Sequence, residues 1–211
     1  MRNPINRLRD GLARHRCAGC LLLVADCLCA LVPRLTTRSR VVLVLHNLED
    51  QKTSNTGKLA VRCLTNSAIV RRGVEGEPTA RVCPSPGFES VLLFPGPGAR
   101  PVQEWVDSPR PIELLVPDGT WGQAQRARQR VIGLGSMPCA MIERAAPSGY
   151  RLRVASDPSR LATIESIAEA LGILEGPGSA EGHPDVRAEL LRIFEVMVTR
   201  SLRHRARARS P

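Results

Sequence analysis

Short runs of apolar residues alternate along this chain with segments whose apolar residues recur at helical spacing. The run over Arg40–His46 and the run over residues 90–94 are continuous, which is typical of strands buried on both faces. A third run, residues 112–116, stops at Pro117 and leads into a polar segment that we expect to be helical over about 121–134. These three runs predict the central strands of the fold.

Weaker patterns complete the alternation of strands and helices. Apolar residues spaced three and four apart predict helices over about 161–174 and 184–202, and a shorter one near residues 59–64. Further short strands are predicted at residues 68–73, 139–143 and 150–154. Strands that alternate with helices favour an α/β fold with a mostly parallel sheet and helices on both faces.

A polar and aromatic group follows the third apolar run directly. Residues 118–121 read Asp-Gly-Thr-Trp and stand where the predicted strand passes into the predicted helix. Ligands of open α/β sheets bind at the carboxyl ends of strands, so this group is a candidate site. Ordinary helix punctuation is the alternative: Asp or Thr caps the helix, Gly makes the turn and Trp packs in the core.

A second polar group follows the Arg40–His46 run. It begins with His46 and Glu49 and continues to Ser54 or Asn55, either of which suits the N-cap of the next helix. A lone histidine at a strand end is more often structural than catalytic. A cluster of polar residues where a strand meets a helix favours a site instead.

The charge balance indicates a polyanionic partner. The 211 residues include 30 Lys+Arg against 20 Asp+Glu, for a net charge of +10, and only two of the basic residues are lysines. Genome base composition can explain arginine in place of lysine, but not the excess of positive charge, which favours nucleic acid. Aromatic residues make up only 3%, so no stacking platform for single strands is apparent.

The N-terminal segment indicates in which cellular compartment we expect the protein. Five arginines precede an apolar run at residues 20–25, an order that resembles a secretory signal peptide. Asp26 interrupts the run, and no small-residue cleavage pattern follows. No run is long enough to span a membrane. We therefore expect a cytoplasmic protein with reduced thiols.

Four of the seven cysteines fall within thirteen residues. They have the spacing C-x2-C-x6-C-x-C and are Cys17, Cys20, Cys27 and Cys29. Four thiolates so close together are typical of a structural Zn²⁺ site. A C-x-x-C redox pair and unliganded thiols are the alternatives, although nothing strand-like precedes the motif as a redox pair would require. We expect a basic lead with a zinc module over residues 1–36, a catalytic domain over 37–175, and a linker, C-terminal helix and basic tail over 176–211.

These motifs together resemble the DTW-domain family of tRNA-uridine aminocarboxypropyltransferases. The resemblance covers about residues 17–175, and the motifs appear in family order. They are the four cysteines, His46-x-x-Glu49, Ser54-Asn55-Thr56-Gly57, Leu93-Phe94-Pro95, Asp118-Gly119-Thr120-Trp121-x-Gln123-Ala124, Tyr150-x-x-Arg153 and Leu161-Ala162-Thr163-Ile164-Glu165. The chain departs from the family at Ala162, where a serine is expected, and at Leu21–Leu23, where a more polar stretch is expected.

The resemblance implies a fold related to the SPOUT class, with a trefoil knot, and S-adenosylmethionine as the donor substrate. The implied reaction moves the 3-amino-3-carboxypropyl group to N3 of a uridine in tRNA and releases methylthioadenosine. Asp118 is the expected catalytic carboxylate, which either takes the N3 proton or binds the donor's amino group. The residues expected at the donor are Phe94, Pro95, Thr120, Trp121, Gln123, Thr163 and Glu165, and those expected around the substrate pocket are His46, Glu49, Asn55 and Thr56.

Two other functions compete with this interpretation. A SPOUT-like RNA methyltransferase would use the same donor but release S-adenosylhomocysteine. A zinc-containing RNA-binding protein would release neither product. The expected partner is tRNA, although the sequence does not rule out ribosomal RNA. No membrane association is expected, and a monomer is favoured although the sequence does not fix the oligomeric state.

Overall fold

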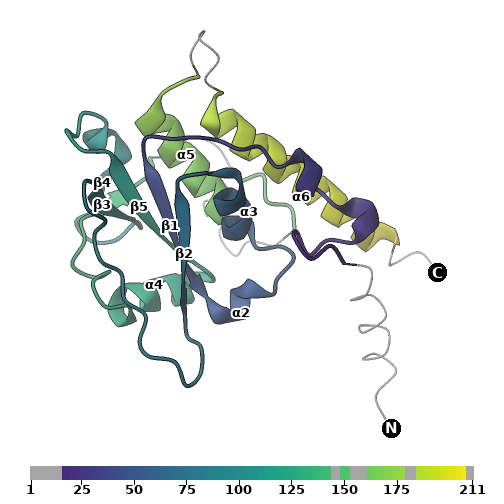
Figure 1. Ribbon diagram of the computed structural model, residues 1–211, viewed down its shortest axis with the longest axis horizontal. Coiled ribbons are helices and arrows are strands. Elements are labelled where there is room, and N and C mark those ends of the chain that lie inside the picture. Colours follow the sequence, from purple (N-terminus) through teal and green to yellow (C-terminus); the bar gives the residue numbers. More distant parts are fainter. Residues whose placement is uncertain (1–15, 144–147, 153–160, 179–183, 208–211) are drawn as a thin grey trace.

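The central feature of the computed structural model is one six-stranded parallel sheet. The structure describes residues 16–143, 148–152, 161–178 and 184–207. Within them the strand order is β2-β1-β5-β3-β6-β4, and every neighbouring pair is parallel. The strands are β1 (Arg40–His46), β2 (Ser67–Arg72), β3 (Glu89–Leu93), β4 (Arg100–Pro101), β5 (Ile112–Asp118) and β6 (Cys139–Met141). The predicted mostly parallel α/β sheet is confirmed (Figure 1).

Helices cover both faces of this sheet, as predicted. The helices are α2 (Asn47–Asp50), α3 (Thr56–Cys63), α4 (Trp121–Arg130), α5 (Thr163–Glu175) and α6 (Val186–Arg207), with short 3-10 turns η1 (Val24–Asp26), η2 (Cys29–Leu31) and η3 (Val102–Trp105). Helices α3 and α5 pack on one face, with α6 against α5, whereas α4 packs on the other. The sheet is therefore buried between two apolar layers.

Strand β1 shows why the sequence forms this arrangement. Its alternate residues Val41, Leu43 and Leu45 belong to the larger core with α3, α5 and α6, while Val42 and Val44 belong to the smaller core with α4. A strand that is apolar on both sides must be covered on both sides. Its β-branched residues also suit the pleated backbone.

The strand order changes direction between β1 and β5. After β1 the chain passes through α3 to β2 on one side, and after β5 it passes through α4 toward β6 on the other. Helices α3 and α4 lie on opposite faces of the sheet. Such a change of direction is the point at which parallel α/β sheets bind ligands, outside the carboxyl ends of the strands.

The structure corrects the expectation that the third apolar run ends at Pro117. Strand β5 continues through Pro117 to Asp118, and both residues pair with β1. The pairing of β5 with β3 ends at Leu115, so Pro117 has only one paired neighbour. A proline without an N–H donor is tolerated where one side of a strand is open. The extension places Asp118 on the strand itself.

Three other boundaries differ from the prediction. Helix α4 ends at Arg130 instead of near residue 134, and α6 extends to Arg207. Residues 151–152 lie in a turn and Tyr150 lies in irregular structure, whereas a strand was predicted, and residues 153–154 lie outside the described part. In place of strand pairing, the Tyr150 hydroxyl donates to the Ser54 carbonyl oxygen, and Ser148 and Gly149 bond to Glu165 of α5.

The cysteine segment packs against the C-terminal helix. Leu22 and Leu28 share the larger core with residues of α6, and the purple N-terminal segment runs along this helix in Figure 1. Arg200 of α6 donates to the carbonyl oxygen of Cys27. The two ends of the described chain therefore support each other. None of the described helices is both long and apolar enough to cross a bilayer.

Candidate active site and metal centre

Asp118 is the polar centre of the site at the carboxyl ends of β1 and β5. Its carboxylate is 3% exposed and accepts a hydrogen bond from Asn55 Nδ2 at 2.5 Å and one from Thr163 Oγ1 at 2.6 Å. Asn55 is the N-cap of α3, where its Oδ1 accepts from the Lys58 backbone N–H, and Thr163 is the first residue of α5. One carboxylate thus joins the start of two helices to the end of β5.

Two glycines allow this close approach. A side chain at Gly57 would place its Cβ 2.9 Å from Asp118 Oδ1 and 2.8 Å from Leu43 Cδ1. Gly119 has φ +140, and a Cβ there would lie 2.6 Å from Gln123 Oε1. Only glycine fits both positions without displacing the surrounding groups. The glycine of the Asp-Gly-Thr-Trp segment therefore serves the turn between β5 and α4.

Thr120 and Gln123 form a capping box at the start of α4. Thr120 Oγ1 accepts from the Gln123 backbone N–H at 3.3 Å, and Gln123 Oε1 accepts from the Thr120 backbone N–H at 2.6 Å. This reciprocal pair satisfies two N–H groups that a helix start leaves open. The helix-punctuation interpretation is thus observed for Thr120, whereas Asp118 bonds to the N-cap residue of α3 and to the first residue of α5.

An aromatic pair lies beside this capping box. Trp121 stacks on Phe94 with ring centroids 5.0 Å apart and an interplanar angle of 19°. Phe94 is buried, Trp121 is 41% exposed, and Pro95 is exposed. The stack presents one aromatic ring to solvent at the edge that carries Asp118. Such an offset stack is a surface on which a further ring can pack.

Glu165 fixes the segment that precedes α5. Its carboxylate accepts from the Ala162 backbone N–H, the Gly149 backbone N–H and the Ser148 hydroxyl, at 2.7, 2.8 and 2.5 Å. The Tyr150 hydroxyl then donates to the Ser54 carbonyl oxygen at 2.8 Å. These bonds hold residues 148–150 next to the loop before α3.

Thr56 links α3 to α5 a second time. Its hydroxyl oxygen accepts from the Ile164 backbone N–H at 3.4 Å. Position 162 is the N-cap of α5, and Ala162 offers no side-chain acceptor there. Thr56 and the two bonds to Asp118 therefore hold the junction of α3 and α5 together.

His46 and Glu49 lie at the end of the neighbouring strand. His46 Nδ1 accepts from the Leu48 backbone N–H at 3.2 Å, which leaves the proton of the neutral ring on Nε2. Burial, followed by the charge of Arg72, lowers the pKa of His46 from its ordinary value. Glu49 is 1% exposed and forms an ion pair with Lys52 at 2.6 Å.

The structure brings the predicted site residues to one edge of the sheet in two groups. Asn55, Thr56, Asp118, Thr163 and Glu165 lie at the junction of α3 and α5, and Phe94, Pro95, Thr120, Trp121 and Gln123 lie around the start of α4. His46 ends β1 and Glu49 lies in α2, and Arg153 of the family motif lies outside the described residues.

Sequence reasoning missed two arginines at or near these sites. Arg72 ends β2 beside His46, and Arg62 of α3 lies beside the cysteines. A charged residue at the end of an apolar strand was a usable signal for Arg72. Nothing in the sequence spacing connects Arg62 with Cys29, which lies 33 positions earlier.

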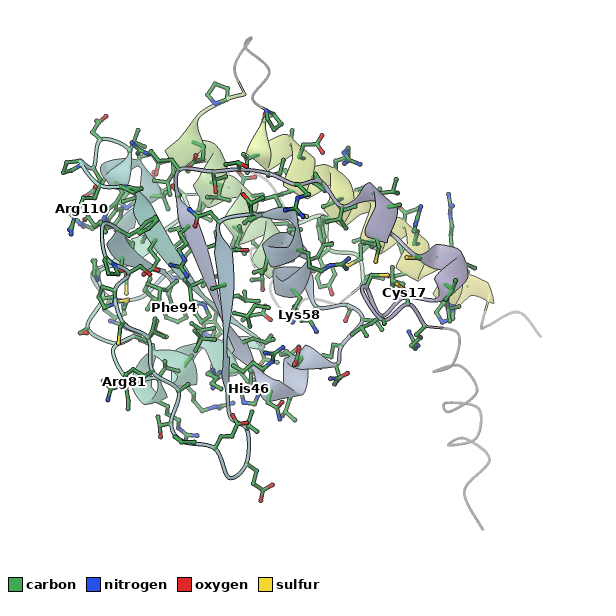
Figure 2. The ribbon with its side chains drawn as sticks, in the orientation of Figure 1. Cys17, His46, Lys58, Arg81, Phe94 and Arg110 are labelled. Atoms are coloured by element: carbon green, nitrogen blue, oxygen red, sulfur yellow. The ribbon has the colours of Figure 1, made fainter. Side chains whose placement is uncertain are left out.

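The four N-terminal cysteines converge on one point, as predicted. Their sulfur atoms all lie within 4.8 Å of one another. The separations are 3.4 Å for Cys17–Cys27, 3.5 Å for Cys17–Cys29 and 3.8 Å for Cys20–Cys27. A tetrahedron with metal–sulfur bonds of about 2.3 Å requires sulfur separations of about 3.8 Å. The cluster could therefore hold a metal ion. Figure 2 shows Cys17 on the side of the molecule formed by α6.

Neighbouring groups shift the pKa values of Cys17 and Cys27 in opposite directions. The backbone N–H of Cys20 and the Cys27 thiol lower the pKa of Cys17 to about 6. The Cys29 backbone N–H also lowers the pKa of Cys27, but the Cys17 and Cys29 thiols outweigh it and raise that pKa to about 12. The protein alone thus favours a thiolate at Cys17 and a neutral thiol at Cys27, and a bound cation would favour loss of the Cys27 proton. Arg62 Nη2 donates to Cys29 Sγ at 3.1 Å and offsets part of that negative charge.

Comparison with known proteins identifies related sequences. A family model described as the DTW domain matches residues 14–202. Three curated relatives are named tRNA-uridine aminocarboxypropyltransferase 2. The protein of Macaca fascicularis is 28% identical over 93% of this chain and 66% of its own length. That of Drosophila melanogaster is 25% identical over 85% and 72%, and that of Mus musculus is 27% identical over 93% and 66%.

The chain spans about two thirds of the length of the curated relatives it matches. No solved structure matches it significantly.

Proposed function

Because the chain belongs to the DTW-domain family, we propose that it is a tRNA-uridine aminocarboxypropyltransferase that uses S-adenosylmethionine as donor and N3 of uridine as acceptor. The names of its curated relatives support the class of reaction. The structural observation that carries the proposal is the position of Asp118, held at the carboxyl end of β5 between the starts of α3 and α5.

The proposed reaction is one displacement at carbon. The N3 lone pair of uridine attacks the γ-carbon of the donor's methionine chain and forms the new C–N bond. The C–S bond breaks, its electron pair stays on sulfur, and neutral methylthioadenosine leaves. The N3 proton must also leave, because protonated N3 is a poor nucleophile. Most of the rate then comes from alignment of N3, carbon and sulfur, together with removal of this proton.

Asp118 is the carboxylate that we assign to this reaction. Each of its oxygens accepts one hydrogen bond from Asn55 or Thr163, so the carboxylate is fixed in position. Asp118 then either accepts the N3 proton or pairs with the donor's ammonium group.

The remaining predicted residues surround this carboxylate. We assign the exposed ring of Trp121, backed by Phe94 and Pro95, to the adenosine of the donor. Thr120, Gln123 and Glu165 hold the starts of α4 and α5, and so act on the donor by positioning those helices. Thr163, Asn55 and Thr56 hold the junction around Asp118, and His46 and Glu49 line the side toward β2 where uridine enters.

Zinc is the metal that we assign to the four cysteines. Four soft thiolate ligands in a tetrahedron select Zn²⁺, and a closed set with no open position is structural. The ion would neutralise the cysteine sulfurs and fix residues 17–29 against α3 and α6, where Arg62 and Arg200 already bond to this segment. We also propose that the parallel sheet belongs to a SPOUT-like fold with its trefoil knot.

The test is product analysis with wild-type protein and the Asp118→Asn variant. Purified protein is incubated with S-adenosylmethionine and unmodified tRNA, and small molecules and digested nucleosides are identified by mass spectrometry. Wild type should give methylthioadenosine and an aminocarboxypropyl-uridine. Asn keeps the shape and one acceptor for Asn55, and its NH2 group can donate to the Thr163 hydroxyl. Folding should therefore persist while kcat falls by about 10²-fold or more if Asp118 takes the proton. A rise confined to the KM for the donor would assign it to the ammonium group instead.

Other products would change the conclusion. S-adenosylhomocysteine with a methylated nucleoside would replace the proposed reaction by methyl transfer. If wild type bound tRNA but gave neither small-molecule product nor a modified nucleoside, and Asp118→Asn behaved in the same way, the protein would act by binding alone.

A further inference from the structure

A buried guanidinium without an anionic partner lies at the end of β2. Arg72 is 8% exposed, and none of the carboxylates in the described part of the chain forms an ion pair with it. Its Nη2 donates to the Gln123 carbonyl oxygen of α4, while its Nε is buried without a partner in those residues. A buried charge left unpaired is costly to folding, so its presence calls for an explanation.

Its surroundings add positive charge. Arg126 and Arg130 follow Gln123 at helical spacing on α4, and both are exposed. Burial, and then the charges of Arg126 and Arg130, lower the pKa of Arg72 from its ordinary value. Neither of these two arginines forms an ion pair with any described carboxylate. By contrast, Arg71 pairs with Asp50 at 2.9 Å.

His46 adds a further donor beside this cluster. It is the register partner of Arg72 in the parallel pair of β1 and β2. Its Nδ1 is occupied as an acceptor, so Nε2 carries the ring proton, and this atom lies on the side of Gly73, where a Cβ would be 3.3 Å away. Guanidinium groups and an imidazole N–H are all hydrogen-bond donors. The cluster can therefore bind an oxyanion that has several acceptor oxygens.

We propose that Arg72, Arg126 and Arg130 form the binding site for one phosphate of the substrate RNA backbone, with His46 at its margin. The proposal rests on the function proposed above. It assigns RNA binding to the arginines of β2 and α4, whereas Asp118 acts in the reaction itself. Arginine binds phosphate through several N–H groups at once. The buried Arg72 supplies a fixed contact, and the exposed pair closes around the phosphate from α4.

The location fits an RNA that enters across the edge of the sheet. Asp118 pairs in register with Leu45, and Arg72 pairs with the next residue, His46. Strands β5, β1 and β2 are consecutive, so the backbones at Asp118 and Arg72 are about 10 Å apart, or two strand spacings. A phosphate held at Arg72 would therefore fix the nucleotide close to Asp118.

The test compares two variants with a matched control. Arg126→Gln/Arg130→Gln removes the exposed pair, and Arg72→Met removes the buried charge while keeping an unbranched side chain. The control is Arg38→Gln/Arg110→Gln, which removes two exposed arginines that precede β1 and β5 and so lie at the opposite edge of the sheet. Figure 2 shows Arg110 at the far end of the sheet from His46.

Binding of the unmodified tRNA is measured by fluorescence anisotropy at several salt concentrations. Both site variants should bind about 10-fold more weakly, and the slope of log K against log salt should become shallower by roughly 0.7 to 0.9 for one lost phosphate contact. The control should change this slope by less than either site variant does. Equal losses in all three proteins would show only general charge attraction and would overturn the proposal.

A second measurement needs neither RNA nor activity. Inorganic phosphate is titrated at constant ionic strength while the His46 ring is followed by NMR. A phosphate bound at Arg72 should raise the pKa of His46 in wild type and in the control, but not in Arg72→Met. No phosphate-dependent change in wild type would contradict the site. This result stands even if methylthioadenosine is never formed, so failure here and failure of the proposed reaction can be told apart.

The donor's carboxylate is the other oxyanion at this edge. If the site variants raised the KM for S-adenosylmethionine and left tRNA affinity unchanged, the arginines would bind the donor and the proposal would be wrong. The stability of Arg72→Met adds a check. An arginine retained for an external anion should be replaceable without loss of stability, since removing a buried unpaired charge is often neutral or favourable.

Discussion

Replacement of Ala162 by serine should stabilise the protein at the start of α5. Ala162 is the N-cap of this helix, with φ −69 and ψ 155, and it has no side-chain acceptor. Glu165 already supplies half of a capping box through its bond to the Ala162 backbone N–H. Thr56 satisfies the Ile164 N–H, whereas the described residues give the Glu165 backbone N–H no partner. A serine hydroxyl at position 162 would accept from that N–H and complete the box.

The expected magnitude follows from the cap and from burial. A serine N-cap is worth about 1 kcal/mol relative to alanine, within a range of roughly 0.5 to 2 kcal/mol. For a chain of this size, 1 kcal/mol shifts the Tm by about 2 to 4 °C. Position 162 is 9% exposed, so a hydroxyl that failed to bond there would instead cost about 1 to 3 kcal/mol. The sign of the change therefore reports directly on the cap geometry.

Urea unfolding of wild type and Ala162→Ser provides the assay. The midpoint should rise with an unchanged m value, because the cap alters stability and not the surface exposed on unfolding. Ala162→Cys, kept reduced, is the control: the thiol occupies nearly the same space but accepts hydrogen bonds poorly. If serine gave no increase, or the same change as cysteine, the inference that the Glu165 N–H lacks a partner would be refuted.

Two further predictions concern the metal centre and His46. Removal of metal with a chelator, or the Cys20→Ser substitution, should release one Zn²⁺ per chain. The unfolding midpoint should fall, because residues 17–29 contact α6 and the core. A purified protein that contains no metal, or one that is equally stable after chelation, would contradict the four-thiolate site. The pKa of His46 should lie below 6.5 in the folded protein, because the folded state disfavours protonation of the ring. The free energy of unfolding should therefore decrease as the pH falls from 6.5 toward the folded pKa, since the unfolded state binds the proton first. Proton NMR with His46→Gln for assignment checks this, and Arg72→Met should bring the midpoint closer to 6.5.

Much of the fold could be predicted from local patterns in the sequence. The continuous run of β1 requires cover on both faces, and that requirement alone predicts the layered α/β arrangement. The cysteine cluster could also be predicted, because its ligands are close in sequence. The end of β5 could not, since Pro117 is tolerated only where β3 has stopped pairing, and the sequence does not show which strands are neighbours.

The roles of the site residues depended on contacts between distant segments. The sequence indicates Asn55 as a cap and Asp118 as a strand-end carboxylate, but 63 positions separate these bonded residues. Glu165 was expected at the donor, and its three acceptor bonds hold residues 148–149 and the start of α5 instead of leaving the carboxylate directed at a ligand. Arg72 lacks any local signal of burial, because a helix that begins about 50 positions later covers it.

The arrangement around Asp118 means that folding and reaction depend on the same group. Helix N-termini attract negative charge, and the starts of both α3 and α5 meet this carboxylate through Asn55 and Thr163. Loss of the Asp118 side chain would leave the buried Asn55 amide and the half-buried Thr163 hydroxyl without this acceptor, so Asp118→Ala would lower activity whether or not the carboxylate takes part in the chemistry. Asp118→Asn leaves an acceptor for Asn55 and a donor that the Thr163 hydroxyl can accept. For that reason only the asparagine variant, with its unfolding free energy measured on the same sample, separates the two contributions of this residue.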